Sequence, residues 1–165
     1  MKAAGGVPGV PVDATPALLF ICYGLFGLTA LATGHVKAAV GLTGLLRLLM
    51  AAGALSAALL VVAAGSWAGL ILSAGLQGMH VMMTSAVLAF WSDRVFPDLP
   101  SRSFTAVLLA TAAGNVLGPA AAGRLLDAYG SDITFLAVAA LSAAAALLLS
   151  GDHVRDRPLR QAGFA

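Results

Sequence analysis

The sequence has no glutamate, a single cysteine and very few charged residues of any kind. Charged side chains make up 10% of its 165 residues, whereas an ordinary soluble domain carries about 25%. The one cysteine, Cys22, excludes an intrachain disulfide and argues against a cysteine-based metal site. With 60% hydrophobic residues, the chain is too apolar for a soluble globular protein, and we expect a protein of the lipid bilayer.

The scarcity of charge also excludes several functions. A net charge of +2 from scattered basic residues does not suit nucleic-acid binding. No glutamate is present to act as a general base, and no G-x-S-x-G, P-loop or H-E-x-x-H motif occurs. We therefore expect no enzymatic activity, no catalytic residue, no metal site and no cofactor.

What the sequence does contain is long uncharged runs. From Leu48 to Ser92, 45 consecutive residues include no Asp, Glu, Lys or Arg. As one helix at about 1.5 Å per residue, this run would be about 67 Å long, more than twice the ~30 Å of a bilayer core. The run therefore predicts two membrane spans rather than one.

The same criterion along the whole chain predicts an all-α integral membrane helical bundle of about five transmembrane helices, occupying residues 16–150. A flexible leader (1–15) precedes it, and a polar tail (151–165) follows. We expect a polar break at 34–37 and an interfacial segment at 38–44, flanked by Lys37 and Arg47, whose side chains reach the headgroups. The predicted spans are residues 17–33, 45–64, 68–91, 103–122 and 133–150.

The basic residues predict the orientation of these spans. Alternate loops place two of them, Lys2 and Arg124, on one side of the membrane and the other seven on the opposite side. Because cytoplasmic loops carry the excess of Lys and Arg, this bias predicts a cytoplasmic tail and an external N-terminus. We expect the protein in a plasma membrane, specifically the inner membrane of a bacterium.

Four polar side chains fall on one stripe of the third predicted span: Ser73, Gln77, His80 and Thr84, spaced by 4, 3 and 4 residues. A polar or ionisable group at this depth normally faces a bundle interior or a water-filled cavity. Either His80 is satisfied by a neighbouring helix, or it contacts a substrate or relays protons, since an imidazole can change charge between about pH 5 and 8.

The fourth predicted span carries a second set of candidates. Asn115 either ties this helix to a neighbour or binds a substrate, and both readings suit an amide in lipid. Gly118 and Pro119 predict a bend, because a proline inside a span frees a backbone carbonyl. Such a bend either serves as a hinge or belongs to a static helix.

The segments Phe96–Val107 and Thr111–Gly130 resemble the penultimate span of major facilitator superfamily transporters. Members of that family commonly show a proline and a basic residue before this span, then a run like G-x-x-x-G-P-x-x-x-G-x-x-x-D-x-x-G. Within the superfamily, the chain is most similar to the YbfB-type bacterial branch. The matching residues are Gly114, Gly118, Pro119, Gly123, Asp127 and Gly130.

This resemblance implies that the last three predicted spans correspond to the tenth, eleventh and twelfth helices of such a transporter. The second span would be the ninth, and the first the seventh or eighth. The chain departs from the family because it has room for five helices of a six-helix carboxyl half and lacks the amino half. The basic loop that the family usually has between its eighth and ninth helices is also reduced here to Lys37 and Arg47.

Two functional hypotheses follow. The chain is a partial or half-size secondary transporter that moves a small solute by alternating access, with a substrate path formed by Gln77, His80, Thr84 and Asn115 and a hinge at Gly118 and Pro119. Transport would then require self-association or a separate amino-terminal half. Alternatively, it is a non-transporting membrane protein, a truncated product or a scaffold, whose polar stripe only holds helices together.

Overall fold

The computed structural model describes residues 14–63, 65–95 and 100–149, and every regular element in these ranges is a helix. The all-α class is therefore confirmed for the described part of the chain. Most of the predicted leader and the whole predicted tail lie outside it. The elements are α1 (Thr15–Gly27), the 3-10 helix η2 (Leu28–Ala32), α2 (Thr33–Val62), α3 (Trp67–Val95), α4 (Pro100–Tyr129) and α5 (Ser131–Leu148).

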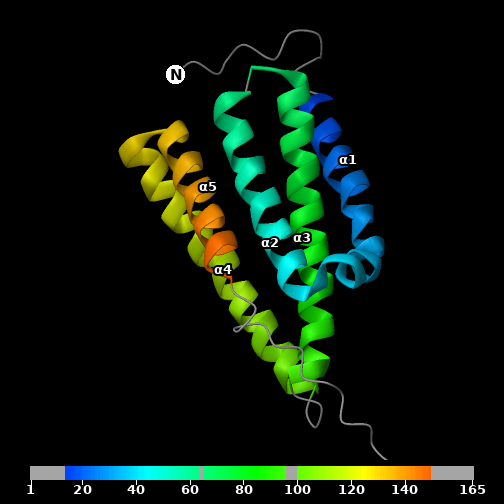
Figure 1. Ribbon diagram of the computed structural model, residues 1–165. Coiled ribbons are helices and arrows are strands. Elements are labelled where there is room, and N and C mark those ends of the chain that lie inside the picture. The colour runs from blue at the N-terminus through cyan, green and yellow to red at the C-terminus, as the bar shows by residue number, and fades with distance from the viewer. Residues whose placement is uncertain (1–13, 64, 96–99, 150–165) are drawn as a thin grey trace, which may run out of the picture.

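Several of these helices are long and apolar enough to cross a membrane. Four such stretches occur in the described ranges: Thr15–Val62, Trp67–Leu88, Thr105–Tyr129 and Ser131–Leu148. The first holds 48 residues, and Figure 1 shows it doubled back, with α1 and α2 running in opposite directions beside α3. The helices thus alternate in direction, and their apolar surfaces are compatible with insertion into a membrane.

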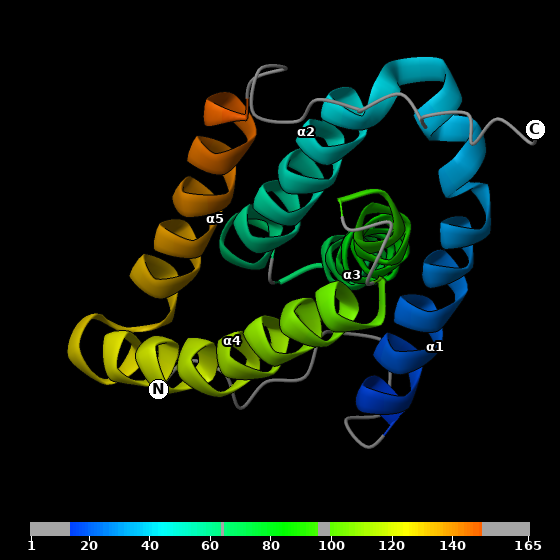
Figure 2. The ribbon, with the colours of Figure 1, turned by 90° about the horizontal axis from the view of Figure 1, so that it is seen from below.

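The link between α1 and α2 differs from the predicted polar break. Residues 34–37 are helical, and the irregular backbone lies instead at Gly41, with φ 73° and ψ 171° inside α2. L-residues with a side chain rarely adopt this conformation, so a glycine is required there. Figure 2 shows the resulting curved connection between the two helices.

Helix α3 lies in the middle of the bundle, where it contacts α1, α2 and α4 and is seen nearly end-on in Figure 2. Its Met83 and Val87 pack against Leu42, Leu45 and Leu49 of α2. These leucines recur at intervals of three and four residues, which places them on one face of the helix. The buried apolar cluster of the fold therefore lies between α2 and α3.

Glycines set the contact between α1 and α3. A Cβ atom built on Gly78 would fall on the backbone carbonyl of Tyr23, and one built on Gly75 would lie 2.8 Å from the ring of Phe26. A Cβ atom built on Gly27 of α1 would likewise lie 3.0 Å from the side chain of Met82. Because apolar side chains gain nothing from leaving lipid, such close backbone approach is how membrane helices associate.

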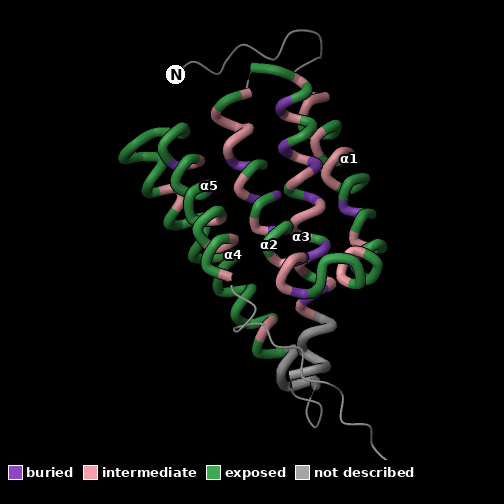
Figure 3. Tube along the Cα trace, in the orientation of Figure 1, coloured by how far each residue is buried: buried purple, intermediate pink, exposed green. Residues whose placement is uncertain are grey.

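Helices α4 and α5 form the outer side of the bundle, and Figure 3 shows most of their residues as exposed. They are joined at Gly130, which follows the last residue of α4 and has a φ of 84°, a conformation in which glycine commonly ends a helix. At the other end of α5, the Nε–H of Arg47 in α2 donates a 2.7 Å hydrogen bond to the carbonyl of Leu149. This bond satisfies a carbonyl that the end of a helix leaves unpaired.

Candidate functional site

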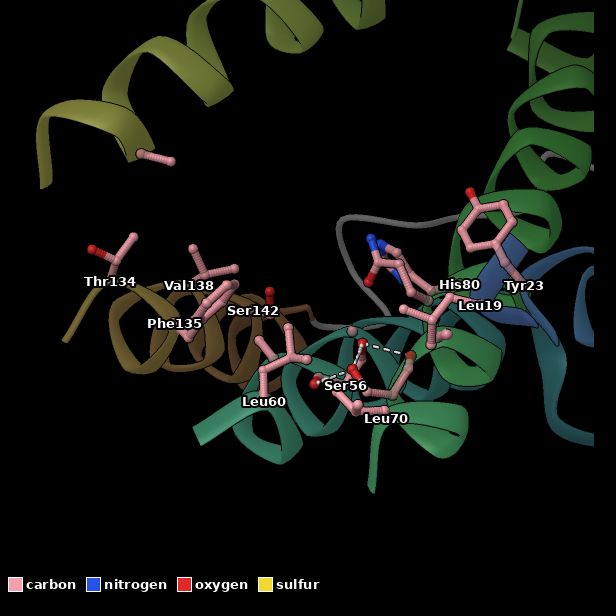
Figure 4. Close-up of a pocket in the computed structure, with 16 residues that line it drawn as sticks. Leu19, Tyr23, Ser56, Leu60, Leu70, His80, Thr134, Phe135, Val138 and Ser142 are labelled. Carbon is pink, nitrogen blue, oxygen red and sulfur yellow. Dashed lines mark hydrogen bonds between the residues drawn. The ribbon is translucent and has the colours of Figure 1, made fainter. Parts of the chain in front are cut away.

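A cavity of about 500 Å³ lies among the helices. Figure 4 shows residues of α5 on one side of it and residues of α1 and α3 on the other, with α2 between them. Its size falls within the range of about 300–1,000 Å³ that is typical of small-molecule sites. The lining residues are Leu19, Tyr23, Gly53, Ser56, Ala57, Leu60, Leu70, Ser73, Ala74, Gln77, His80, Ala122, Thr134, Phe135, Val138 and Ser142.

Two serines form one wall of this cavity by pairing α2 with α3. The Ser56 hydroxyl donates to the Ser73 carbonyl at 2.9 Å, and the Ser73 hydroxyl donates to the Ser56 carbonyl at 2.8 Å. Both side chains are buried. The reciprocal pair fixes the register of the two helices, and bonds of this kind between membrane helices contribute about 0.6–1.7 kcal/mol each.

His80 lies two turns along α3 from Ser73 and meets α2 at Leu49. Its Nδ1 atom is 2.7 Å from the Leu49 carbonyl oxygen. The imidazole approaches α2 this closely because Gly53 has no side chain, and a Cβ atom built there would lie 3.3 Å from Nδ1. The missing side chain at Gly53 thus allows His80 to form a second hydrogen bond between the same two helices.

This bond fixes the proton position on the neutral His80 ring. A main-chain carbonyl only accepts hydrogen bonds, so Nδ1 must carry the hydrogen. In the neutral ring the lone pair is therefore on Nε2, and that ring borders the cavity. His80 accordingly both joins two helices and supplies a hydrogen-bond acceptor to the cavity wall, so the two sequence-based interpretations of this residue are compatible.

The other polar side chains that line the cavity are uncharged. Gln77, one turn before His80, is exposed and contributes an amide with both donor and acceptor atoms. Tyr23 and Ser142 add hydroxyl groups, whereas the Thr134 hydroxyl is bonded to the Gly130 carbonyl at 2.8 Å. None of the lining residues is Asp, Lys or Arg.

The structure brings together two of the four predicted path residues. Gln77 and His80 line the cavity, whereas Thr84 and Asn115 do not. The Thr84 hydroxyl oxygen is buried without a hydrogen-bond partner. Asn115 is exposed on α4, and Thr111, one turn earlier, bonds the Val107 carbonyl of its own helix.

The predicted hinge and the family-like motif lie mostly on the exposed surface of α4. The backbone remains helical through Gly118 and Pro119, and no atom lies within 4 Å of a Cβ built on Gly114, Gly118 or Gly123. Asp127 is exposed near the end of the helix. These glycines therefore do not contribute to helix packing within the described part of the chain.

The sequence gives little reason to single out several of the residues that line the cavity. Ser56 is one serine in an apolar span, and Gly53 is one glycine among many. Their spacing from Leu49, at intervals of four and three residues, places all three on one face of α2. That pattern shows which face is small and polar, but the pairing with Ser73 and His80 depends on helix register.

No group of three or more potential metal ligands occurs in residues 14–63, 65–95 and 100–149. Comparison with known proteins adds no relative to this picture. No protein-family model, curated protein or solved structure matches the chain.

Proposed function

We propose that the chain supplies the helices of the carboxyl half of a major facilitator-type secondary transporter, and that it moves a small solute by alternating access. The observation that carries this proposal is the cavity bordered by Gln77 and His80. Polar groups inside a membrane bundle characteristically mark a substrate path. The motif on α4 supports the family assignment, through the residues from Gly114 to Gly130.

The arrangement of the helices supports five crossings and a cytoplasmic end. The link between α1 and α2, the start of α4 and the end of α5 lie at one end of the bundle (Figure 1). Lys37 and Arg47 also lie toward this end of the bundle. The excess of basic residues there favours the cytoplasmic side of a bacterial inner membrane.

In transporters of this type the solute site lies between two repeats, and one repeat rocks against the other. We therefore propose that a second copy, or a separate amino-terminal half, completes the path. Thr84 and Asn115 are path residues only in such an assembly. The exposed α4 surface that carries Asn115 leaves room for that contact.

A scaffold without transport activity is the second candidate function. It is favoured by the hydrogen bonds of Ser73 and His80, since both join α3 to α2. A scaffold needs these bonds but does not need the cavity. The two proposals therefore differ in whether the chain carries a measurable flux of solute.

Counterflow of radiolabelled thymidine, uracil and phenyl glucoside, three uncharged solutes that carry hydrogen-bond donors, into proteoliposomes tests transport. We expect saturable exchange of at least one of these solutes above that of protein-free liposomes. His80→Ala should lower it at least about tenfold, since a lost hydrogen bond to solute has an effect of this order. Asn115→Ala tests the part of the path on α4, and Leu141→Ala, at an exposed position of α5, serves as the control.

No exchange of any of the three solutes would favour the scaffold. Exchange that is unchanged in both His80→Ala and Asn115→Ala would remove both residues from the path.

A further inference from the structure

We propose that the cavity selects an uncharged, largely apolar solute that carries a hydrogen-bond donor, and that Nε2 of His80 accepts that hydrogen bond. This inference rests on the proposed solute path and names the class of molecule that would pass along that path. Three properties of the cavity carry it: the absence of charge in its lining, the fixed tautomer of the neutral His80 ring and the apolar space beside it.

The lining excludes ions. A carboxylate or ammonium group that enters the cavity must give up water, and this costs several kcal/mol unless an opposite charge replaces it. No Asp, Lys or Arg is among the lining residues. The other helices that border the cavity likewise contribute no charge to it, since Gly53 and Ser56 of α2, Tyr23 of α1 and Thr134 of α5 are neutral.

The His80 tautomer favours a donor on the solute. Because Nδ1 is hydrogen-bonded to the Leu49 carbonyl, rotation of the ring would break a bond between α2 and α3. The neutral ring therefore presents a lone pair at Nε2 in a fixed orientation. A solute hydroxyl or N–H group matches this lone pair, whereas an ether of the same shape leaves two acceptors facing each other.

The space that adjoins the His80 cavity suits an apolar body. A second cavity of about 400 Å³ is lined by Thr15, Pro16, Leu19, Phe20, Tyr23 and Ala74. Leu19, Tyr23 and Ala74 also line the first cavity, so the two adjoin along α1. A planar hydrocarbon group can occupy this space while its donor reaches His80.

Four naphthalenes of nearly equal size separate these properties: 2-naphthol, 2-methoxynaphthalene, 2-naphthoate and 2-naphthylmethylammonium. Their saturable binding is measured by naphthalene fluorescence with the full chain in lipid nanodiscs, after subtraction of empty nanodiscs. We expect 2-naphthol to bind about tenfold more tightly than 2-methoxynaphthalene, the effect of one hydrogen bond. Both ions should bind at least tenfold more weakly than 2-naphthol.

The variant His80→Asn separates recognition from helix packing. The asparagine amide keeps an N–H donor near the position of Nδ1, so the bond to Leu49 can persist, but it has no counterpart of Nε2. We expect the preference for 2-naphthol over its methyl ether to disappear, with the thermal unfolding midpoint close to that of the wild type.

Equal binding of 2-naphthol and 2-methoxynaphthalene to the wild-type protein would overturn the proposal, and this comparison requires no variant. Tighter binding of either ion, a preference that persists in a folded His80→Asn variant, or no saturable binding of any probe would also overturn it. Selective binding of 2-naphthol without solute exchange would support the inference while contradicting the transport proposal, so the two can fail separately.

Discussion

Gly78→Ala is expected to force α1 away from α3 and to lower the free energy of unfolding by about 1–3 kcal/mol. The added methyl group would meet the backbone carbonyl of Tyr23. A backbone group cannot rotate aside as a side chain can, so one helix must shift as a whole. The change is measured by reversible unfolding in mixed micelles of increasing denaturing detergent.

Gly114→Ala is the matched control for this substitution. It makes the same change inside a helix, but no atom lies within 4 Å of the new Cβ. Alanine is the better helix former, so we expect stability to stay the same or to rise by up to about 1 kcal/mol. Equal effects of the two substitutions would mean that α1 does not pack against α3 as described.

Gly41→Val is expected to lower the free energy of unfolding by about 1–3 kcal/mol through backbone strain alone. Gly41 has a φ of 73°, and nothing lies within 4 Å of a Cβ built there. Steric clash with neighbours is therefore not the cause, and the cost comes from holding a β-branched residue in a conformation that suits only glycine.

Gly34→Val provides the comparison, because Gly34 is also surrounded by open space but lies in regular helix with no positive φ. Intrinsic helix propensity makes this change nearly neutral. If both valine variants were equally stable under the same detergent titration, the kink within α2 would not depend on Gly41.

The helical class and the approximate position of the membrane-length helices could be predicted from the sequence, because absence of charge over about 20 residues is a strong physical constraint. The kink could not be located in the same way. The polar run beginning at Gly34 predicts a break, yet residues 34–37 are helical and the backbone departs from helix only at Gly41. One glycine of nineteen has no distinctive local pattern.

The candidate site was predicted in part for a similar reason. Helical spacing places Gln77 and His80 on one stripe, and both line the cavity. The same spacing includes Thr84, which is outside it, because a stripe along a helix extends beyond the region that one cavity covers. Asn115 could be assigned a depth in the membrane but not a neighbour, since the rotation of α4 is set by packing.

Ser56 shows the limit of sequence patterns most clearly. Its two hydrogen bonds with Ser73 depend on the register of α2 against α3. That register results from the contacts of the α2 leucines with Met83 and Val87 and from the space that Gly53 leaves for His80. The partners in each of these contacts are far apart along the chain. A pattern within one helix therefore predicts the polar face, and the fold determines its partner.

The central claim is that the cavity beside Gln77 and His80 is a path that opens to both sides of the membrane. Gln77→Cys in a Cys22→Ser background provides the most direct test, with an uncharged, membrane-impermeant reagent, a glucosyl-linked methanethiosulfonate, applied to right-side-out and inside-out vesicles. Gly65→Cys, in the exposed turn between α2 and α3, and Leu141→Cys, on the exposed apolar face of α5, serve as references.

We expect Gln77→Cys to react from both faces, Gly65→Cys from one face only and Leu141→Cys from neither. Reaction of Gln77→Cys from a single face, or from neither, would contradict the claim and leave the polar stripe as a means of holding helices together.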